Sequence, residues 1–179
     1  MRMTRTIGLL VGVALALGGA ACAAAPESAV ATPGGEGTVT IADKTFTVNN
    51  IKLSYATGEG AYFRVEGDDA ANPNKDCLPG LSGGLALYGD VPGDVKSIAD
   101  FNGRELPFEF TGDGDDANLC FVGTNGLLGV EQGSVRFTVQ GSSVSFTFSG
   151  TFGLYDGSGG RSSSDITASG SGVAHVSKP

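Results

Sequence analysis

Residues 134–154 read SVRFTVQGSSVSFTFSGTFGL and decide the fold. Apolar side chains alternate with polar ones on both sides of Gly141-Ser142, which is typical of two half-buried strands joined by a tight turn. The second strand has one apolar face and one face rich in hydroxyls, and its apolar face consists of Val144, Phe146, Phe148, Phe152 and Leu154. The stretch therefore predicts a β-hairpin that buries one face.

A strand of small residues follows at 165–176, where Ala, Ser and Gly fill half of the positions, 168–172 among them. Such a strand packs only where bulky neighbours occupy the space that it leaves, and aromatic side chains can cover strand glycines. We expect Phe146, Phe148 and Phe152 to do so. Residues 157–164 are predicted to form the loop between the two strands.

The same two-residue period runs through the chain from Thr38 onward, and helical periodicity is nearly absent. Asn49-Asn50 interrupts the phase, which suggests a bulge. Asn102-Gly103 favours a type I′ turn between two strands. The other short strand candidates are 38–41, 46–53, 62–66, 85–88, 95–101, 105–110 and 119–122.

This pattern predicts an all-β fold of about 8–10 short strands. We expect an antiparallel β-sandwich, with a closed β-barrel as the alternative that pattern alone leaves open. Whether the apolar interior is filled or hollow is also left open, because ten phenylalanines at strand spacing fit either a packed core or a lined cavity.

The N-terminus has the pattern of an export signal: Arg2 and Arg5 precede an apolar run from Ile7 to Leu17, and small residues follow. We expect residues 1–21 to be a signal peptide. Residues 22–36 are rich in Ala, Pro and Gly, which predicts a lipidated N-terminus with a flexible linker. Residues 37–179 are then one β domain, a size at which a single core forms.

Cys22 follows Ala20-Ala21, which resembles the site where bacterial lipoproteins are cut and acylated on the cysteine. Gly19 departs from that motif, which usually has an aliphatic residue there. We expect Cys22 to carry acyl chains that anchor the protein to a bacterial cell membrane or envelope outside the cytoplasm. The alternative is an ordinary cut beyond Cys22, which yields a secreted domain.

The net charge of −8 becomes more negative once Arg2 and Arg5 are removed, so binding to nucleic acid is disfavoured. Trp is absent and His175 is the one histidine, four residues from the end, where an exposed or edge position is expected. The pairs Glu105/Glu109 and Asp113/Asp115 have carboxylates but no accompanying base or sugar-stacking Trp. We therefore predict no catalytic residues and no enzyme.

Cys77 and Cys120 are the remaining cysteines, and a pair in an exported protein persists as a disulfide. Two free buried thiols are the alternative. Such a bond draws two acidic loops together. Carboxylates at close spacing suit calcium, although an EF-hand pattern is incomplete here. No cofactor is required, and the predicted calcium ligands are Asp68, Asp69, Asp76, Asp113, Asp115 and Asp116.

Residues 94–106 (DVKSIADFNGREL) and 148–152 (FSGTF) resemble the mycobacterial surface lipoprotein antigen family over about half of the chain. The resemblance implies an N-terminal lipid anchor, a linker, a Gly-rich β domain and a place in the cell envelope, with no catalytic residues. The family places its cysteines differently from Cys77 and Cys120, so the disulfide does not follow from it.

These observations support three functional hypotheses. The first is a non-enzymatic, lipid-anchored envelope surface module that is adhesive or recognises a partner such as a surface protein. The second is a carrier that holds an apolar ligand or lipid inside the β domain. The third is a freely secreted protein with an activity of its own, enzymatic activity included.

Overall fold

The computed structural model describes residues 34–72, 76–78, 81–110, 116–124, 126–155 and 161–177. For 76–78, 81, 82, 109, 161 and 164 it describes the backbone alone. The described part consists of strands and one short 3₁₀ helix: β1 (Gly35–Ile41), β2 (Lys44–Tyr55), β3 (Tyr62–Asp69), β4 (Asp76–Leu78), β5 (Leu81–Ser82), β6 (Gly84–Asp90), η1 (Ile98–Phe101), β7 (Glu105–Glu109), β8 (Asn118–Cys120), β9 (Leu127–Gln140), β10 (Ser143–Tyr155) and β11 (Arg161–Val176).

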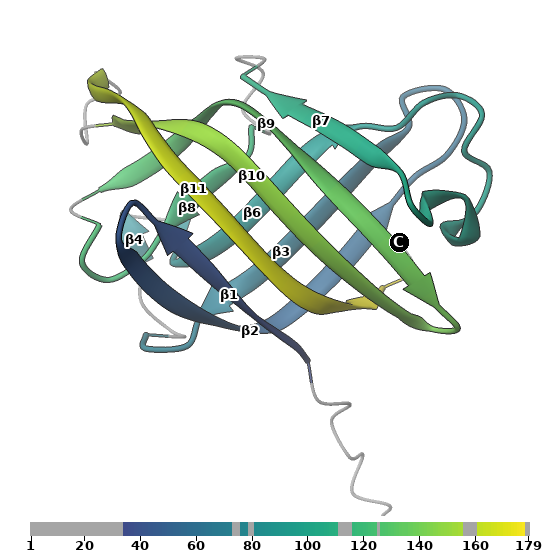
Figure 1. The fold of residues 1–179 in the computed structure, drawn as a ribbon, viewed down its shortest axis with the longest axis horizontal. Coiled ribbons are helices and arrows are strands. Elements are labelled where there is room, and N and C mark those ends of the chain that lie inside the picture. The colour runs from purple at the N-terminus through teal and green to yellow at the C-terminus, as the bar shows by residue number, and fades with distance from the viewer. Residues whose placement is uncertain are drawn as a thin grey trace, which may run out of the picture. The chain divides into compact units, whose positions relative to one another are not determined.

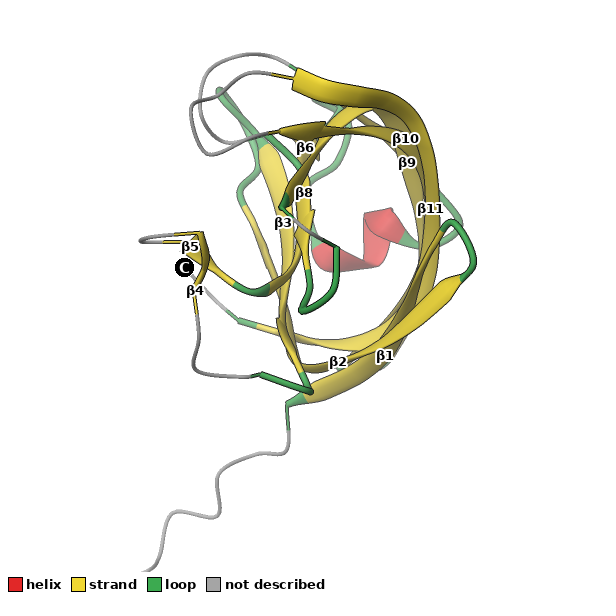
Figure 2. Cartoon of the chain, turned by 90° about the vertical axis from the view of Figure 1, so that its left-hand side faces the viewer, coloured by secondary structure: helices red, strands yellow, loops and turns green. Residues whose placement is uncertain are grey.

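The main sheet closes on itself as a β-barrel (Figures 1 and 2). Its strand order is β10-β11-β1-β2-β3-β6-β8-β9, and β9 pairs again with β10 along nearly its whole length. Neighbouring strands in this ring are antiparallel. A short parallel contact joins the end of β11 to β2 at His175 and Lys52. β4 and β5 form a separate two-stranded hairpin.

The expectation of a β-sandwich is therefore wrong, and the alternative of a closed barrel is confirmed. Both architectures bury one face of each strand, so both have the same two-residue period. They differ in whether the first and last strands of the sheet pair, and that depends on twist and register, which the alternation does not record.

The barrel closes through the fewest residue pairs beside β9. The edge of β9 that does not pair with β10 is shared by two short strands: β8 pairs at Leu128 and Gly129, and β7 pairs further along at residues 132–136. β8 also pairs with β6 through three residues, Gly84–Ala86. Two short strands thus complete one wall of the barrel.

Most of the predicted strands are present, but residues 95–101 are not a strand. They include η1, which begins after Ser97. The Asp100 carboxylate accepts hydrogen bonds from the backbone N–H groups of Lys96 and Ser97, both at 2.9 Å. These bonds, that from Lys96 foremost, lower the pKa of Asp100. Local side-chain bonding of this kind favours a helix start over a strand.

Asn102-Gly103 also differs from the predicted type I′ hairpin. Asn102 has φ −61° and ψ 121°, and Gly103 has φ 74°. This is the type II pattern, and Arg104 N–H donates to the Phe101 carbonyl at 3.0 Å. The turn joins η1 to β7, so its first residue does not need the positive φ of a hairpin turn. The predicted bulge is confirmed: β2 and β3 change register between Asn49 and Lys52, and Asn50 has φ 55°.

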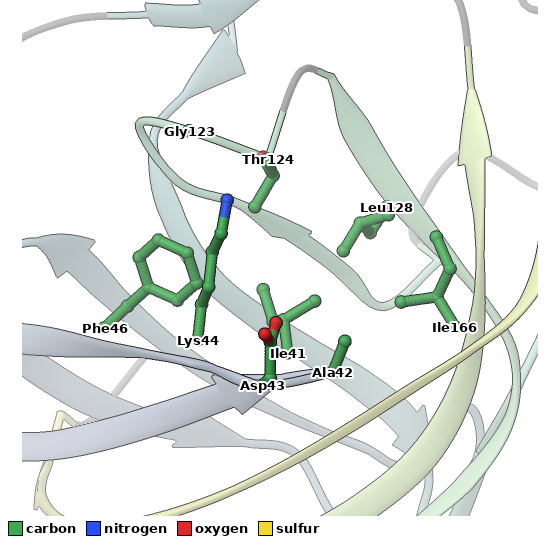
Figure 3. Close-up of a pocket in the computed structure, with 9 residues that line it drawn as sticks. All are labelled: Ile41, Ala42, Asp43, Lys44, Phe46, Gly123, Thr124, Leu128 and Ile166. Atoms are coloured by element: carbon green, nitrogen blue, oxygen red, sulfur yellow. The ribbon is translucent and has the colours of Figure 1, made fainter.

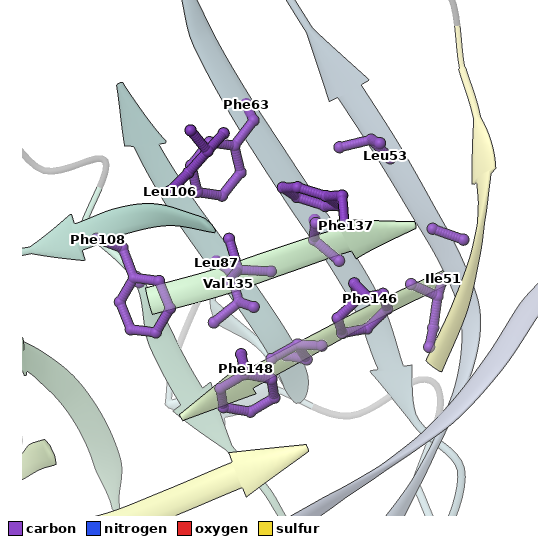
Figure 4. Close-up of a cluster of buried hydrophobic side chains, with 14 of the residues drawn as sticks. Ile51, Leu53, Phe63, Leu87, Leu106, Phe108, Val135, Phe137, Phe146 and Phe148 are labelled. Carbon is purple, nitrogen blue, oxygen red and sulfur yellow. The ribbon is translucent and has the colours of Figure 1, made fainter. Parts of the chain in front are cut away.

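Side chains fill the barrel interior where β10 pairs with β11 (Figure 4). Phe148 lies opposite Gly170, and Phe146 lies opposite Gly172. A Cβ placed on Gly172 would lie 3.0 Å from the Phe146 ring, and one on Gly170 would collide with the Phe148 ring. The expected filling by these two phenylalanines is confirmed, whereas Phe152 lies opposite Ile166.

Aromatic rings from different strands meet inside the barrel. Phe63 of β3 and Phe101 of η1 both pack edge-on against Phe137 of β9, with ring centroids 5.5 and 5.4 Å apart. Phe108 of β7 lies 6.4 Å from Phe148 and 6.3 Å from Phe152. Side chains from facing walls therefore touch, as in a packed core.

Two hairpin turns offer a matched stability test. Ala42 and Gly141 each occupy the first central position of a two-residue turn, with φ 52° and 62°. We expect Ala42→Gly to raise the free energy of unfolding by about 0.5–1 kcal/mol, because relief of the left-handed conformation exceeds the entropic cost of glycine. Gly141→Ala should lower it by about 1 kcal/mol, although no atom lies within 4 Å of the new methyl group. Urea unfolding of both variants checks the opposite signs, and a fall for Ala42→Gly contradicts the explanation.

Candidate functional site

A pocket opens at the end of the barrel that carries the Ala42-Asp43 turn, here called the mouth (Figure 3). Its volume is about 260 Å³. It is lined by the β1–β2 turn, the segment after β8, and the beginnings of β9 and β11. Four segments far apart in the sequence thus contribute to one site, which we call the mouth site.

The floor of the mouth site is apolar. Ile41, Leu128 and Ile166 come from β1, β9 and β11, and Phe46 comes from β2. Ile41 and Leu128 belong to the buried core, whereas Ile166 and Phe46 are half-buried. Their alternation places them inward, and the barrel ends above them. The floor is therefore the exposed end of the hydrophobic core, to which an apolar group can add.

The rim carries two opposite charges, on Asp43 and Lys44. Figure 3 shows the Lys44 ammonium pointing toward Gly123 and Thr124, away from the Asp43 carboxylate. Neither side chain forms an ion pair or hydrogen bond with another described residue. The ammonium therefore remains available to an anionic group above the floor.

Gly123 and Thr124, in the segment after β8, form one wall of the site. The Phe121 ring stacks on Phe46, with centroids 4.8 Å apart. The Thr124 hydroxyl lies 2.8 Å from the Phe121 carbonyl and 2.9 Å from the Gly126 carbonyl, and it can donate to either. Val122 is 60% exposed beside this stack. The ring stack and the Thr124 hydrogen bonds thus hold the segment that carries Gly123 and Thr124 into the pocket lining.

Buried Asp69 fastens this wall to β3. Its side chain is only 2% exposed, and its two carboxylate oxygens accept from the backbone N–H groups of Val122 and Ala71, each at 2.9 Å. Charge-assisted bonds of this kind offset the cost of burying the carboxylate. Asp69 therefore holds in place a segment that follows it by more than fifty residues.

The predicted calcium ligands are not brought together among the described residues, where no group of three or more metal-ligating side chains occurs. Asp69 bonds to the backbone as above, and Asp68 accepts from the Asn50 side chain at 2.9 Å. Asp116 lies just before β8. Asp113, Asp115 and the side chain of Asp76 lie outside the described residues, so calcium binding stays a prediction.

The predicted covalent sites are only partly described. Cys120 is fully buried at the end of β8. For Cys77 the backbone alone is described, within β4, and Cys22 lies outside the described residues. The Cys77–Cys120 disulfide and the acylation of Cys22 therefore stay predictions.

The carboxylate considered for catalysis forms surface pairs instead. Glu105 accepts from the Ser134 hydroxyl at 2.8 Å and from Arg136 at 2.7 Å, and these bonds lower the pKa of Glu105. The Asp94 pKa is likewise lowered by its hydrogen bonds from Arg104. His175 is exposed on β11, as expected. The side chain of Glu109 lies outside the described residues.

Comparisons with protein-family models, with curated proteins and with solved structures find no match for this chain. The resemblance to the mycobacterial surface lipoprotein antigens therefore stays a prediction. Within the described ranges, no helix has the length and apolar character to cross a membrane.

Sequence reasoning missed the mouth site. Lys44 looks like an ordinary turn residue, and Ile41, Leu128 and Ile166 look like ordinary inward positions of three strands. The one local signal is Phe121-Val122, which ends an apolar run that begins at Leu119 and is followed by a turn segment. The pocket exists because four strand ends meet there, and no spacing along the chain records that meeting.

Replacement of Asp69 tests the anchoring of the wall. Asp69→Ala leaves the Val122 and Ala71 N–H groups without their acceptor, so we expect the free energy of unfolding to fall by about 3 kcal/mol. Asp68→Ala is the matched control and should cost less than about 1 kcal/mol, because its bond is exposed. Urea unfolding measures both, and hydrogen exchange should show faster exchange of the Val122 amide in Asp69→Ala alone. Equal losses in the two variants would contradict the anchoring role.

Proposed function

We propose that this chain is a non-enzymatic, lipid-anchored extracytoplasmic module that recognises a partner in or near the cell envelope by holding an apolar, anionic group in the mouth site. The observation that carries the proposal is the mouth pocket itself. Its floor is apolar core, and its rim has the Lys44 ammonium, which pairs with no other described residue. Burial of an acyl chain or similar group against such a floor contributes about 25 cal/mol per Å².

The charged groups support recognition over catalysis. A general acid near neutral pH needs a raised carboxyl pKa. The pKa values of Asp94, Asp100 and Glu105 are instead lowered by hydrogen bonds from Arg104, from backbone amides and from Ser134 with Arg136. These carboxylates stay ionised and stabilise the surface of the fold, which is consistent with a binding module.

The course of β1 supports an anchor that leaves the mouth accessible. β1 starts at Gly35 and reaches the mouth at Ile41, a distance of about 20 Å at the usual rise of an extended strand. An acyl anchor on Cys22 therefore joins the domain at the end of β1 remote from the pocket. In this arrangement a partner reaches the mouth site without first displacing the start of the domain.

The second candidate function is carriage of an apolar ligand inside the barrel. It is favoured by the direct continuity of the pocket floor with core residues Ile41 and Leu128. A ligand that enters further has to displace rings such as Phe152, which lies opposite pocket residue Ile166 and packs against Phe108. This cost favours binding at the mouth over storage within the barrel.

Titration of the purified domain with lauric acid and with dodecylammonium tests the mouth site. We expect lauric acid to bind more tightly, because Lys44 pairs with the carboxylate. Ile166→Asp should weaken binding of lauric acid at least about tenfold, because a carboxylate in the floor must be desolvated when the chain enters. Lys44→Gln should shift the preference toward dodecylammonium, because Asp43 is then the remaining charge on the rim, while both amphiphiles still bind.

Val173→Asp is the matched control, because Val173 lies on the same strand, is 40% exposed and is not part of the pocket lining. It should leave binding unchanged. Equal weakening by Ile166→Asp and Val173→Asp would contradict binding in the mouth. Native mass spectrometry and organic extraction of the purified domain address the second candidate, since a co-purified lipid that resists removal is expected only of an interior carrier.

Intact mass of the full-length protein, expressed in a bacterium that processes lipoproteins, tests the predicted lipid anchor and localisation. We expect a chain that begins at Cys22 and carries acyl mass, with Cys22→Ala abolishing that mass. Non-reduced protein should weigh two hydrogens less than reduced protein, because Cys77 and Cys120 form a disulfide in an oxidising compartment. A chain that begins beyond Cys22 would reject the anchor and make a secreted protein the better hypothesis. An unchanged mass on reduction would leave two thiols.

A further inference from the structure

An aromatic ring of the core lies directly behind the floor of the mouth site. On β9, Leu128 lines the pocket, and Val130 is the next inward residue further from the mouth. Phe152 of β10 lies opposite Val130, and it also lies opposite pocket residue Ile166 of β11. Side chains that are opposite each other share one face of a sheet. Since Phe152 is fully buried, its ring lies inside the barrel next to the pocket.

A second ring fills the space beside Phe152. The inner row that begins with pocket residue Ile41 continues with small residues, because Ala168 lies opposite Ile41, Gly150 opposite Ala168, and Gly133 opposite Gly150. The ring of Phe108, from β7, occupies the room that they leave. A Cβ placed on Gly150 would lie 3.3 Å from this ring, and one on Gly133 would collide with it. The small residues therefore leave no open passage into the barrel.

Phe108 and Phe152 together form what we call the ring barrier. Their ring centroids are 6.3 Å apart, and Phe108 also lies 6.4 Å from Phe148. Phe108 is 1% exposed and Phe152 is not exposed at all. Rings packed in this way cannot move aside without forcing their neighbours out of place, which is costly in a close-packed core. An apolar chain that enters from the mouth therefore ends at the ring barrier.

The volume in front of the barrier limits what the mouth site can hold. The pocket has about 260 Å³. An apolar protein cavity of about 150 Å³ accepts benzene, which has six carbon atoms. By the same ratio the mouth site accepts about ten carbon atoms. This is room for one unbranched acyl chain of that length, and a lipid with two longer chains does not fit.

We propose that the mouth site selects a single unbranched fatty acid anion of about ten carbons, and that the ring barrier sets this length. The inference rests on the proposed function, since it concerns the same site. The carboxylate pairs with Lys44 at the rim, and the chain covers Ile41, Leu128 and Ile166. Carbons that exceed the available volume stay in water and add no affinity.

The test is isothermal titration of the purified domain with unbranched carboxylates of even length from hexanoate to myristate, ionised and below their critical micelle concentrations. Each methylene that moves from water into an apolar site strengthens binding about fourfold. We expect affinity to rise at about that rate from hexanoate to decanoate. From decanoate to myristate it should change by less than about threefold in total, because the added carbons find no room.

Phe152→Ala removes one ring of the barrier and should extend the pocket. Its affinity should keep rising from decanoate to myristate, by at least about tenfold. Phe101→Ala is the matched control, because Phe101 is equally buried but its ring packs against Tyr55 and Phe137, and Tyr55 ends β2 away from Lys44. This variant should keep the plateau of the parent. Circular dichroism of each variant confirms that the barrel has formed.

Ile166→Phe tests the limit without opening a cavity in the core, since Ile166 is half-buried in the pocket lining. The larger side chain takes up part of the volume, so the plateau should begin at octanoate or earlier.

The outcomes separate this inference from the proposed function. If none of the carboxylates binds, the mouth site is not a binding site for an apolar anion, and the length limit falls with it. If they bind but affinity rises steadily to myristate, the mouth site stands and the length limit is wrong. A plateau that Phe152→Ala and Phe101→Ala move equally, or that Ile166→Phe leaves in place, would also overturn the role of the ring barrier.

Discussion

The barrel depends on a match of volume between two neighbouring strands. The inner face of β11 consists largely of Ala and Gly, and the inner face of β10 carries phenylalanines that fill the space β11 leaves. If both strands had large inner side chains, the wall could not curve as tightly around one core. If both had small ones, the interior would hold a void. The complementary pair lets β10 join β9 on its other side, and that pairing closes the sheet.

Closure of the barrel determines where a ligand can reach the apolar core. Because rings such as Phe63, Phe101 and Phe137 pack across the interior, the core is exposed at the mouth, where strands end. At this end of the barrel, burial of the Asp69 carboxylate costs desolvation free energy, which its hydrogen bonds to the backbone offset. Its bond to the Val122 N–H fixes the segment after β8, which lines one side of the pocket. The mouth site is thus a consequence of how the barrel is finished and not of a local motif.

The outer surface follows from the same alternation. Each inward phenylalanine of β10 alternates with an outward Ser or Thr, and register then aligns these residues with the hydroxyls of β11, β1 and β2. Thr147 and Ser171, or Ser149 and Ser169, have no special relation in sequence. They become neighbours because the strands that fill the core are antiparallel partners. The packed interior and these aligned outward hydroxyls are therefore two results of one pattern.

The sequence by itself determined the all-β class, the inward position of Phe146 and Phe148, the bulge at Asn49-Asn50 and the exposure of His175, because each of these depends on a few adjacent residues or on a two-residue period. It did not determine that residues 95–101 include a 3₁₀ helix, at whose start the Asp100 carboxylate accepts hydrogen bonds from two backbone N–H groups. Only the tertiary structure decided that the sheet closes, that Asp69 holds the segment beside a pocket and that Lys44 lines that pocket together with Ile41, Leu128 and Ile166. These features are contacts between residues far apart in the chain. Alternation predicts on which face of the sheet a side chain lies, whereas register and closure decide which other residues it contacts there.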